Sequence, residues 1–562
     1  MSKNLYRTIF NKRLGMLIVV AKATGSQGKT GRGACIGRRL LVGSALACAI
    51  LGFSATQAWA QTVIDTGLSV FGSVNYGGAL TVGESGTGTL LFNISGSSAT
   101  DTTGTIGDTT TGVGTVVLNI VAGQWTNTST LTVGNAGTGT VSIGAGSVVT
   151  NTSAIVGNSA GGTGTVTVDG AGAQWNSSAA LTVGVAGTGT LTVAEAGTAS
   201  ATDGITIADA SGSVGAINIG AAVSDPAADA GTLDTPTVTF GAGTGNLVFN
   251  HTSDDYVFDP VISGGSLATS SVDVLAGTTI FTANDTYAGL TTIAAAGTLQ
   301  LGNGGTSGSI TSDVTDDGAL VFNRSNEMTF AGVISGSGTV NQIGAGTTVL
   351  TGQSAYSGTT TVAAGTLAAS GSDNVFSAAS DYAVANGATL ELQATNETVG
   401  SLTNKGTVDM GTGASPGKTL TTSGNYTGSG GGTLIMGGAL DGSADDVLHV
   451  QGNTSGDTTI DYTGKLPAAA TTDDGILVVR VDGASTGTFT LETSPLTVGA
   501  FTYVLVKGTA NPKNWYLQVV TPRGFGGGTG NAAPIPTLNE TALALLAALL
   551  GLSAAALKRR EG

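Results

Sequence analysis

Basic residues are missing from almost half of this chain, since no lysine or arginine occurs from Gln61 to Asn323. Of the 20 lysines and arginines, nine lie in residues 1–60 and three lie at the extreme C-terminus. The eight that remain face 34 acidic residues, so residues 61–539 carry a net charge of about −26. Nucleic-acid binding needs a positively charged surface, so nucleic acid is excluded as a partner.

Cysteine and proline are scarce as well. Both cysteines, Cys35 and Cys48, precede residue 61, so a chain cleaved there holds no disulfide. That suits a protein that crosses a membrane unfolded. Only 10 prolines accompany 92 glycines without a Gly-x-y period, which excludes collagen, and a hydrophobic content of 40% argues against simple disorder.

Residues suited to catalysis are few. The two histidines are His251, which we expect on the surface, and His449, and no G-x-S-x-G turn precedes a helix. A glycoside hydrolase needs paired carboxylates, but adjacent residues on a strand face opposite ways. The adjacent pairs are Asp254/Asp255, Asp316/Asp317, Asp445/Asp446 and Asp473/Asp474. We therefore expect no catalytic residue, cofactor or metal site. The alternative function is that of a glycan-active β-helix enzyme, with one of these acidic pairs as its catalytic residues.

Residues 34–60 form a signal for export. Two arginines precede an apolar run over residues 40–53, and Ala58 and Ala60 then provide the small-x-small pattern of a signal-peptidase site. We predict cleavage before Gln61, with an N-terminal membrane anchor as the alternative. Signal peptidase and the general export machinery are therefore expected partners.

The extension before this signal carries Tyr6-Arg7 and Asn11-Lys12. It resembles the extended signal peptide region of large autotransporters and related exoproteins. The resemblance implies export across the inner membrane of a Gram-negative-type cell, with slow passage that keeps the passenger unfolded.

The C-terminus has three parts: a Pro-containing head, an apolar run and a basic tail. Residues 541–557 are uncharged, and as a helix they would span roughly 25 Å, close to a membrane crossing. The segment resembles the IPTL-CTERM sorting domain, which implies a single transmembrane helix and a membrane-embedded sorting or processing enzyme. The residues of the predicted sorting signal are Ile535, Pro536, Thr537, Leu538, Glu540, Lys558, Arg559 and Arg560.

The front half of the chain is periodic. Similar segments begin at Leu80, Ile106, Leu131, Ile155, Leu181 and Ile205, and this regular spacing is typical of a solenoid. Each unit holds two short alternating strands, such as "LTV" and "GTVSI", separated by a Gly-rich turn. The pattern predicts a parallel β-helix with about one repeat per coil. The units resemble repeats associated with type V secretion and PEP-CTERM proteins.

Two tryptophans, Trp125 and Trp175, stand two repeats apart in "GQW" and "AQW". They are candidate surface-binding aromatics that would form a platform for a carbohydrate. The alternative is a packing role at a corner of the coil, which is the more frequent use of such residues.

A second repeat type follows. "YSGTTTVAAGTL" from Tyr356 to Leu367 resembles the autotransporter-associated β-strand repeat, and a related copy contains Tyr287. Residues from about 404 to 518 resemble the C-terminal part of a pertactin-like passenger. In that family this part caps the β-helix and seeds its folding, and His449 would be a residue of the cap.

These observations predict an all-β chain: a right-handed parallel β-helix with a C-terminal β cap, plus the C-terminal transmembrane helix. The expected domains are the extended signal peptide (1–60), repeats (61–245), β-strand repeats (246–403), cap (404–520), Gly-rich linker (521–533) and sorting signal (534–562). The 44 residues after Gln518 are too few for a translocator barrel, so we expect the sorting signal in its place.

We expect an adhesin-like structural protein, held transiently at the inner membrane and then surface-exposed or secreted. Its rigid acidic β-helix would attach to an unknown surface, glycan or protein ligand. Ice or crystal binding would need regular Thr-x-Thr rows, which alanine and valine interrupt.

Mass spectrometry of the mature protein tests the predicted processing. We expect an N-terminus at Gln61 and a C-terminus near Pro536 in the exported fraction, with the uncut tail in the membrane fraction. An N-terminus upstream of residue 40 in the exported protein would contradict the predicted cleavage site.

Overall fold

The computed structural model describes residues 6–11, 16–21, 39–42, 61–70, 72–411, 416–440, 444–464, 474–498 and 501–520. All regular structure in these ranges is β-strand, and they contain no apolar helix long enough to cross a membrane. The predicted all-β class is confirmed, whereas the predicted helix at 541–557 lies outside the described residues. The chain divides into two compact units, unit 1 (1–253, 260–272 and 287–289) and unit 2 (254–259, 273–286 and 290–562).

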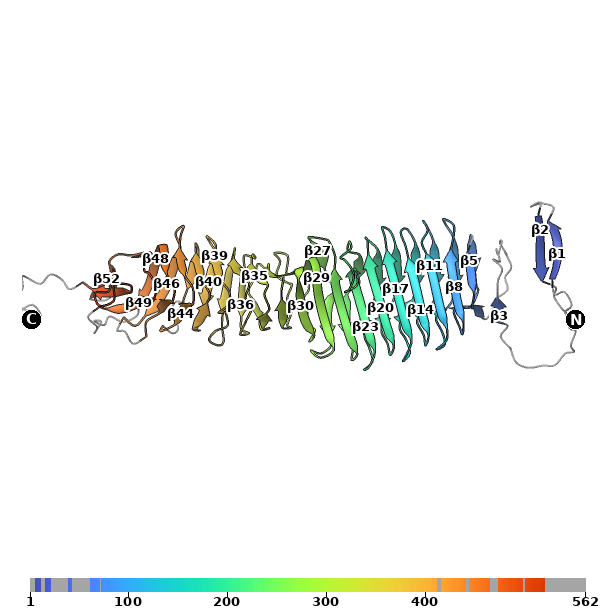
Figure 1. The fold of residues 1–562 in the computed structure, drawn as a ribbon, viewed down its shortest axis with the longest axis horizontal. Coiled ribbons are helices and arrows are strands. Elements are labelled where there is room, and N and C mark those ends of the chain that lie inside the picture. Colours follow the sequence, from blue (N-terminus) through green and yellow to red (C-terminus); the bar gives the residue numbers. More distant parts are fainter. Residues whose placement is uncertain are drawn as a thin grey trace, which may run out of the picture. The chain divides into compact units, whose positions relative to one another are not determined.

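Successive coils of unit 1, from β4 to β24, contribute one strand to each of three parallel sheets. One coil consists of β13 (Thr130–Val133) in sheet I, β14 (Thr138–Ile143) in sheet II and β15 (Val148–Asn151) in sheet III. In sheet II, Thr138 pairs with Thr163, which pairs with Thr188, so one repeat makes one coil. Figure 1 shows the sheet II strands side by side in sequence order.

The strands of unit 1 fall into these sheets as follows. Sheet I contains β3 (Arg39–Val42), β4 (Gln61–Ile64), β7 (Ala79–Val82), β10 (Gly104–Ile106), β13, β16 (Ser153–Val156), β19 (Leu181–Val183), β22 (Ile205–Ile207), β25 (Thr237–Phe240) and β28 (Val261–Gly264). Sheet II contains β5 (Gly67–Val70), β8 (Thr87–Phe92), β11 (Val113–Leu118), β14, β17 (Thr163–Asp169), β20 (Thr188–Ala194), β23 (Val214–Gly220) and β26 (Thr244–Asn250). Sheet III contains β6 (Ser73–Asn75), β9 (Ser98–Asp101), β12 (Gln124–Asn127), β15, β18 (Gln174–Ser177), β21 (Thr198–Ala201) and β24 (Thr232–Asp234). Near the N-terminus, β1 (Tyr6–Asn11) pairs antiparallel with β2 (Met16–Ala21).

Stacked rows of aliphatic side chains form the core of unit 1. On sheet II every second residue points inward, so Val116, Val141 and Val166 lie directly above one another. Ile143 and Val168 form a parallel row two residues further along the strands. Each coil alone would expose its inward face, and stacking on its neighbours removes that apolar surface from water.

Glycines make the corner between sheets I and II possible. Gly134 follows β13 with φ +72°, a left-handed conformation that side chains other than glycine rarely adopt. Five residues later, Gly139 lies so close to the corner that a Cβ atom there would be 2.3 Å from the Gly134 nitrogen and 2.4 Å from the Ile106 oxygen. The "VGNAGTG" spacing is therefore a steric requirement of the turn.

The sequence interpretation missed one strand in each coil. Sheet III is built from segments such as "QWTN" and "QWNS", in which Asn, Gln and Ser outnumber the residues that favour strands. These segments are strands because their backbones pair in register with the coils above and below. The repeat thus has three strands where two were predicted.

Unit 2 is also a stack of parallel strands. Its first ladders contain β31 (Val314–Asp316), β34 (Ile334–Ser335), β32 (Ala319–Phe322), β35 (Thr339–Gln342), β37 (Thr360–Val362), β39 (Tyr382–Val384), β42 (Leu402–Asn404), β45 (Tyr426–Gly428) and β48 (Thr454–Gly464). A second ladder contains β33 (Met328–Phe330), β36 (Thr347–Leu350), β38 (Thr366–Ala369), β40 (Thr389–Leu392), β43 (Thr407–Asp409), β46 (Thr433–Gly438), the long strand β48 again, and β50 (Thr488–Leu491). The strands β27 (Tyr256–Phe258), β29 (Ser270–Phe281) and β30 (Leu290–Leu301) precede them.

The last sheet of unit 2 changes from parallel to antiparallel pairing. It begins with the parallel strands β41 (Glu397–Val399), β44 (Thr419–Thr422), β47 (Val447–Val450) and β49 (Ile476–Val481). It continues with the antiparallel strands β53 (Trp515–Val519), β52 (Phe501–Lys507) and β51 (Leu496–Val498). These antiparallel strands cover the edge of β49, to which the strand of a further parallel coil would otherwise pair. The coiling therefore ends here.

The tyrosine of the second repeat type lies inside the coil. Tyr356 is fully buried, and its hydroxyl is 2.6 Å from Thr360 Oγ1 and 3.2 Å from the Tyr382 hydroxyl. Thr360 Oγ1 is in turn 2.8 Å from Ser380 Oγ. The Y-S-G-x-T spacing therefore places two partners of one interior hydrogen-bond network on the same coil.

Substitution of Gly139 tests the corner. We expect Gly139→Ala to lower the free energy of unfolding of unit 1 by roughly 2–4 kcal/mol, because the new Cβ overlaps rigid backbone. Gly67→Ala is the matched control, since a Cβ there meets no atom within 4 Å. Urea unfolding followed by tryptophan fluorescence measures both. Equal stability of the two variants would contradict the steric role.

Candidate functional site

A row of buried polar side chains runs through sheet III. Asp101, Asn127, Asn151 and Ser177 occupy the last position of four successive strands, and each is at least 95% buried. Asn127 Nδ2 donates to Asp101 Oδ1 at 2.5 Å, and Asn151 Nδ2 donates to Ser177 Oγ at 2.7 Å. These contacts pair amides and hydroxyls that would otherwise lose hydrogen bonds to water on burial.

Both candidate tryptophans belong to this interior row. Trp125 Nε1 donates to Asp101 Oδ2 at 2.6 Å, and Trp175 Nε1 donates to Asn151 Oδ1 at 2.7 Å. The exposed fractions of the two residues are 0% and 1%, so neither ring offers a face on which a sugar could stack. Both tryptophans thus have a packing role inside the coil, where each indole nitrogen donates to a buried acceptor of the preceding coil.

Burial raises the pKa of Asp101 to about 6, and the hydrogen bonds from Trp125 and Asn127 oppose that rise. The carboxylate is costly inside the coil because it has no cation as a partner among its hydrogen-bonded neighbours. Asn151, the equivalent residue two coils later, makes the same contact with its tryptophan without a charge.

A shallow groove of about 400 Å³ lies along the ends of the sheet III strands. Every side chain that lines it is an uncharged Asn, Ser or Thr. They are Asn127, Thr150, Asn151, Thr152, Asn176, Ser177, Ser178, Ser200 and Thr202. The buried amides of Asn127 and Asn151 thus belong both to the interior row and to the lining of the groove.

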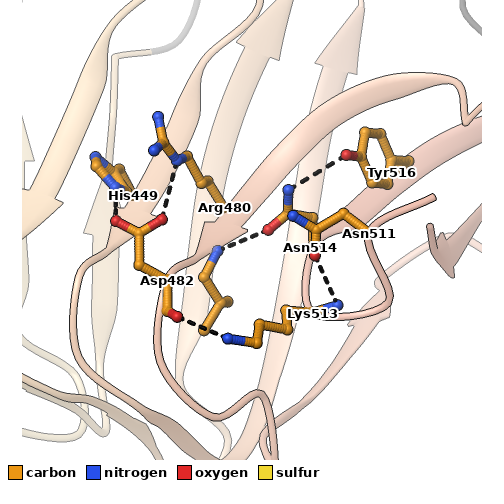
Figure 2. A network of polar contacts seen from close by, with 8 residues as sticks. His449, Arg480, Asp482, Asn511, Lys513, Asn514 and Tyr516 are labelled. Atoms are coloured by element: carbon orange, nitrogen blue, oxygen red, sulfur yellow. Dashed lines mark hydrogen bonds and ion pairs between the residues drawn. The ribbon is translucent and has the colours of Figure 1, made fainter.

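The last sheet of unit 2 carries a polar network of different character, shown in Figure 2. His449 on β47 lies beside Arg480 on β49, and both contact Asp482, at 2.8 Å and 3.1 Å. Lys513 Nζ donates to the Asp482 backbone oxygen at 2.9 Å. The hydrogen bond with His449 and the contact with Arg480 lower the pKa of Asp482. That His449 belongs to a cap stays a prediction from the resemblance.

The acidic residues singled out from the sequence lie in different environments in the described part of the chain. Asp316 is fully buried and Asp317 is exposed, as expected for adjacent residues on opposite faces of a strand. Asp446 accepts hydrogen bonds from the backbone nitrogens of Gly417, Lys418 and Gly437, so it anchors two chain segments. Asp473 lies outside the described residues, whereas Asp474 accepts from the backbone and hydroxyl of Thr509.

His251 is not on the surface, contrary to the expectation from sequence. It is fully buried and forms a bridge with Ala228, because the segment before β24 folds over the end of β26. Burial lowers the pKa of its imidazole. The polar sequence "HTSDD" around it gave no sign of this cover.

Of the predicted processing residues only Gln61 is described, and it begins β4. The other residues of the cleavage site, Ala58 and Ala60, lie outside the described ranges, as does the whole predicted sorting signal from Ile535 to Arg560.

Four known family models match five segments of the chain. Residues 397–505 match the autochaperone domain type 1, and residues 276–301 and 340–369 match the passenger-associated transport repeat. Residues 1–51 match the extended signal peptide of the type V secretion system, and residues 533–560 match the IPTL-CTERM motif. The resemblance to an exported autotransporter-like passenger with a sorting tail is confirmed.

Curated relatives match parts of the chain. An uncharacterized protein, YuaQ, of Escherichia coli strain K12 is 33% identical over 36% of this chain and 15% of its own length. The autotransporter adhesin AIDA-I of Escherichia coli is 41% identical over 19% of this chain and 9% of its own length. The adhesin BmaC autotransporter of Brucella suis is 52% identical over 11% of this chain and 2% of its own length. The chain therefore spans less than one sixth of the length of each of these relatives.

A solved structure, the Haemophilus influenzae Hap adhesin, aligns with 81% of this chain and 64% of its own, at 16% identity and a TM-score of 0.27. A superposition of that quality does not by itself establish a common fold.

The buried carboxyl of Asp101 predicts a pH dependence. Its folded pKa of about 6 lies above the ordinary value of 3.8, so the folded state binds the proton more tightly than the unfolded state. Protonation of Asp101 therefore adds to the free energy of unfolding. This contribution, roughly 2–3 kcal/mol, is complete below about pH 4 and is lost as the pH rises through about 6. We expect Asp101→Asn to remove this dependence of the free energy of unfolding on pH, because the amide does not titrate.

Urea unfolding of wild type and variant from pH 4 to pH 7 measures the difference, and comparing them cancels the opposite contribution of His251. The surface substitution Asp203→Asn serves as control and should leave the slope unchanged. Identical slopes in wild type and Asp101→Asn would contradict the assignment.

Proposed function

We propose that this chain is the exported, adhesin-like passenger of a Gram-negative-type cell and that it acts by presenting β-helical coils on the cell surface or in secreted form. The observation that carries the proposal is the match of residues 397–505 to an autochaperone domain. At the C-terminal end of that segment the parallel ladders of unit 2 give way to antiparallel pairing, in which β51 lies within the segment, β52 crosses its end and β53 follows it.

The coil architecture suits a structural binding protein. Its inward faces are occupied by stacked aliphatic rows, and its outward faces present mostly Thr, Ser, Asn and Gly. Such a stack fixes its backbone through the pairing between coils, so outward residues can change while the coil persists. The net negative charge of the passenger repels anionic surfaces.

The proposed division of the chain follows the same logic. Residues 61–245 and 246–403 supply two kinds of β-helical repeat, which we take to be right-handed because parallel crossover connections are almost always so. Residues 404–520 act as the cap and as the part that folds first, and residues 521–533 are the Gly-rich linker. A cap is needed because an open edge of parallel strands would recruit further strands.

The two ends direct the chain. We propose that signal peptidase cleaves after Ala60, following the small-x-small pair with Ala58. The segment 534–562 then holds the passenger at the inner membrane as a single helix, with its basic tail in the cytoplasm. A membrane-embedded processing enzyme recognises this segment before the passenger is released to the surface.

Attachment and localisation test the proposal together. We expect deletion of the chain to reduce attachment of cells to surfaces or to one another, and we expect external protease to degrade the passenger on intact wild-type cells. A chain without residues 534–562 should leave the inner membrane yet fail to restore attachment. Full protection from external protease, or unchanged attachment after deletion, would contradict the function.

A further inference from the structure

We propose that the groove along sheet III binds an uncharged glycan chain. This inference rests on the proposed adhesin function and gives that function a ligand class and a site. The groove is the one defined above by Asn127, the segment 150–152, the segment 176–178, Ser200 and Thr202.

Three consecutive coils supply the same positions to this groove. Thr150 pairs with Asn176, which pairs with Ser200, and Asn151 pairs with Ser177 in the next register position. Adjacent parallel strands lie about 4.8 Å apart, so one set of polar groups recurs at that interval along the groove. That step is close to the length of one pyranose ring in an extended glycan, so successive sugars would meet equivalent groups.

The floor of the groove is fixed before a ligand arrives. Asn127, Asn151 and Ser177 are at least 95% buried, and Trp175 holds Asn151 through the hydrogen bond from its indole nitrogen. Because these side chains cannot turn toward bulk water, they lose little conformational freedom when a ligand binds. A preformed polar floor of this kind favours a ligand that fits without rearranging the coil.

The rim supplies both donors and acceptors. Thr152 donates its hydroxyl to the Thr128 backbone oxygen at 3.1 Å, and Thr202 donates to the Ser178 oxygen at 2.5 Å. A hydroxyl that donates in this way keeps its oxygen available as an acceptor. Asn176 adds an amide, whose Oδ1 already accepts from Ser200. Sugar hydroxyls, which donate and accept alike, match this mixture of groups.

Charge argues for a neutral ligand. No lysine or arginine occurs from Gln61 to Asn323, so unit 1 offers no cation from that stretch to pair with a uronate or sulfate group. A second depression in unit 1 is lined by Glu195 and Asp229 and would repel such groups. An uncharged glycan needs no cation as a partner and is not repelled by the acidic side chains. It needs only the hydrogen bonds that the Asn, Ser and Thr side chains provide.

The groove has no aromatic side chain in its lining, so it lacks the stacking surface that strengthens many sugar sites. Binding at a single groove is therefore expected to be weak. Many copies on one cell would act together, and their combined avidity would be much greater than the affinity of one groove.

The test uses the full exported chain and a panel of uncharged oligosaccharides, with uronic-acid and sulfated oligosaccharides alongside. A triple variant, Thr152→Val with Asn176→Ala and Ser178→Ala, removes rim groups while leaving the buried floor intact. The matched control, Ser142→Ala with Thr163→Val and Thr188→Val, removes hydroxyls from the outward face of sheet II. Thermal unfolding by circular dichroism checks that both remain folded.

We expect at least one uncharged oligosaccharide to bind the wild type and the control equally, and the groove variant about tenfold more weakly or not at all. Equal binding by the groove variant, binding of acidic oligosaccharides alone, or no binding in the panel would overturn the inference. Attachment of cells that carry each variant separates the two proposals. If wild-type cells attach and the groove variant attaches equally, the groove inference fails while the adhesin function stands. If deletion of the whole chain leaves attachment unchanged, the adhesin function itself fails.

Discussion

The in-register stacking of parallel coils is the constraint on which unit 1 depends. Val141 lies between Val116 and Val166 of the neighbouring coils. The same pairing fixes the positions of all the other strand residues in the coil. A shift of one residue would bring the threonines of sheet II inside and the valines outside. The near-constant repeat length and the corner glycines are both consequences of this stacking, because each coil must close at the same place as the last.

The interior also contains polar groups, and their placement has consequences for stability. The buried row of sheet III satisfies its own hydrogen bonds, and the network around Tyr356 does so in unit 2. A carboxyl such as Asp101 is retained at a cost, because burial favours its neutral form. Position 101 and position 151 show that the same contact with tryptophan forms with or without a charge. The charge is therefore not required for the architecture.

The change from parallel to antiparallel pairing defines the C-terminal end of unit 2. It places the network of His449, Arg480 and Asp482 on a sheet that differs from the acidic coils in both topology and charge. The autochaperone model matches residues 397–505, which include this network and β51. Local antiparallel contacts form faster than distant parallel ones, because less chain has to be ordered before they close.

The sequence by itself determined the repeat, the strand class and the two ends of the chain. Alternating apolar residues in "GTVSI" have a period of two, and the regular recurrence of such segments can only be accommodated by stacking similar coils. The leader and the tail were recognisable because export signals are local patterns of charge and hydrophobicity that need no fold. Tertiary structure decided the rest. Trp125 and His251 are buried because neighbouring coils and a distant segment cover them, and no local pattern encodes that cover. The groove on sheet III likewise exists only where strands from successive coils lie side by side, and those strands have a composition that does not by itself favour β-structure.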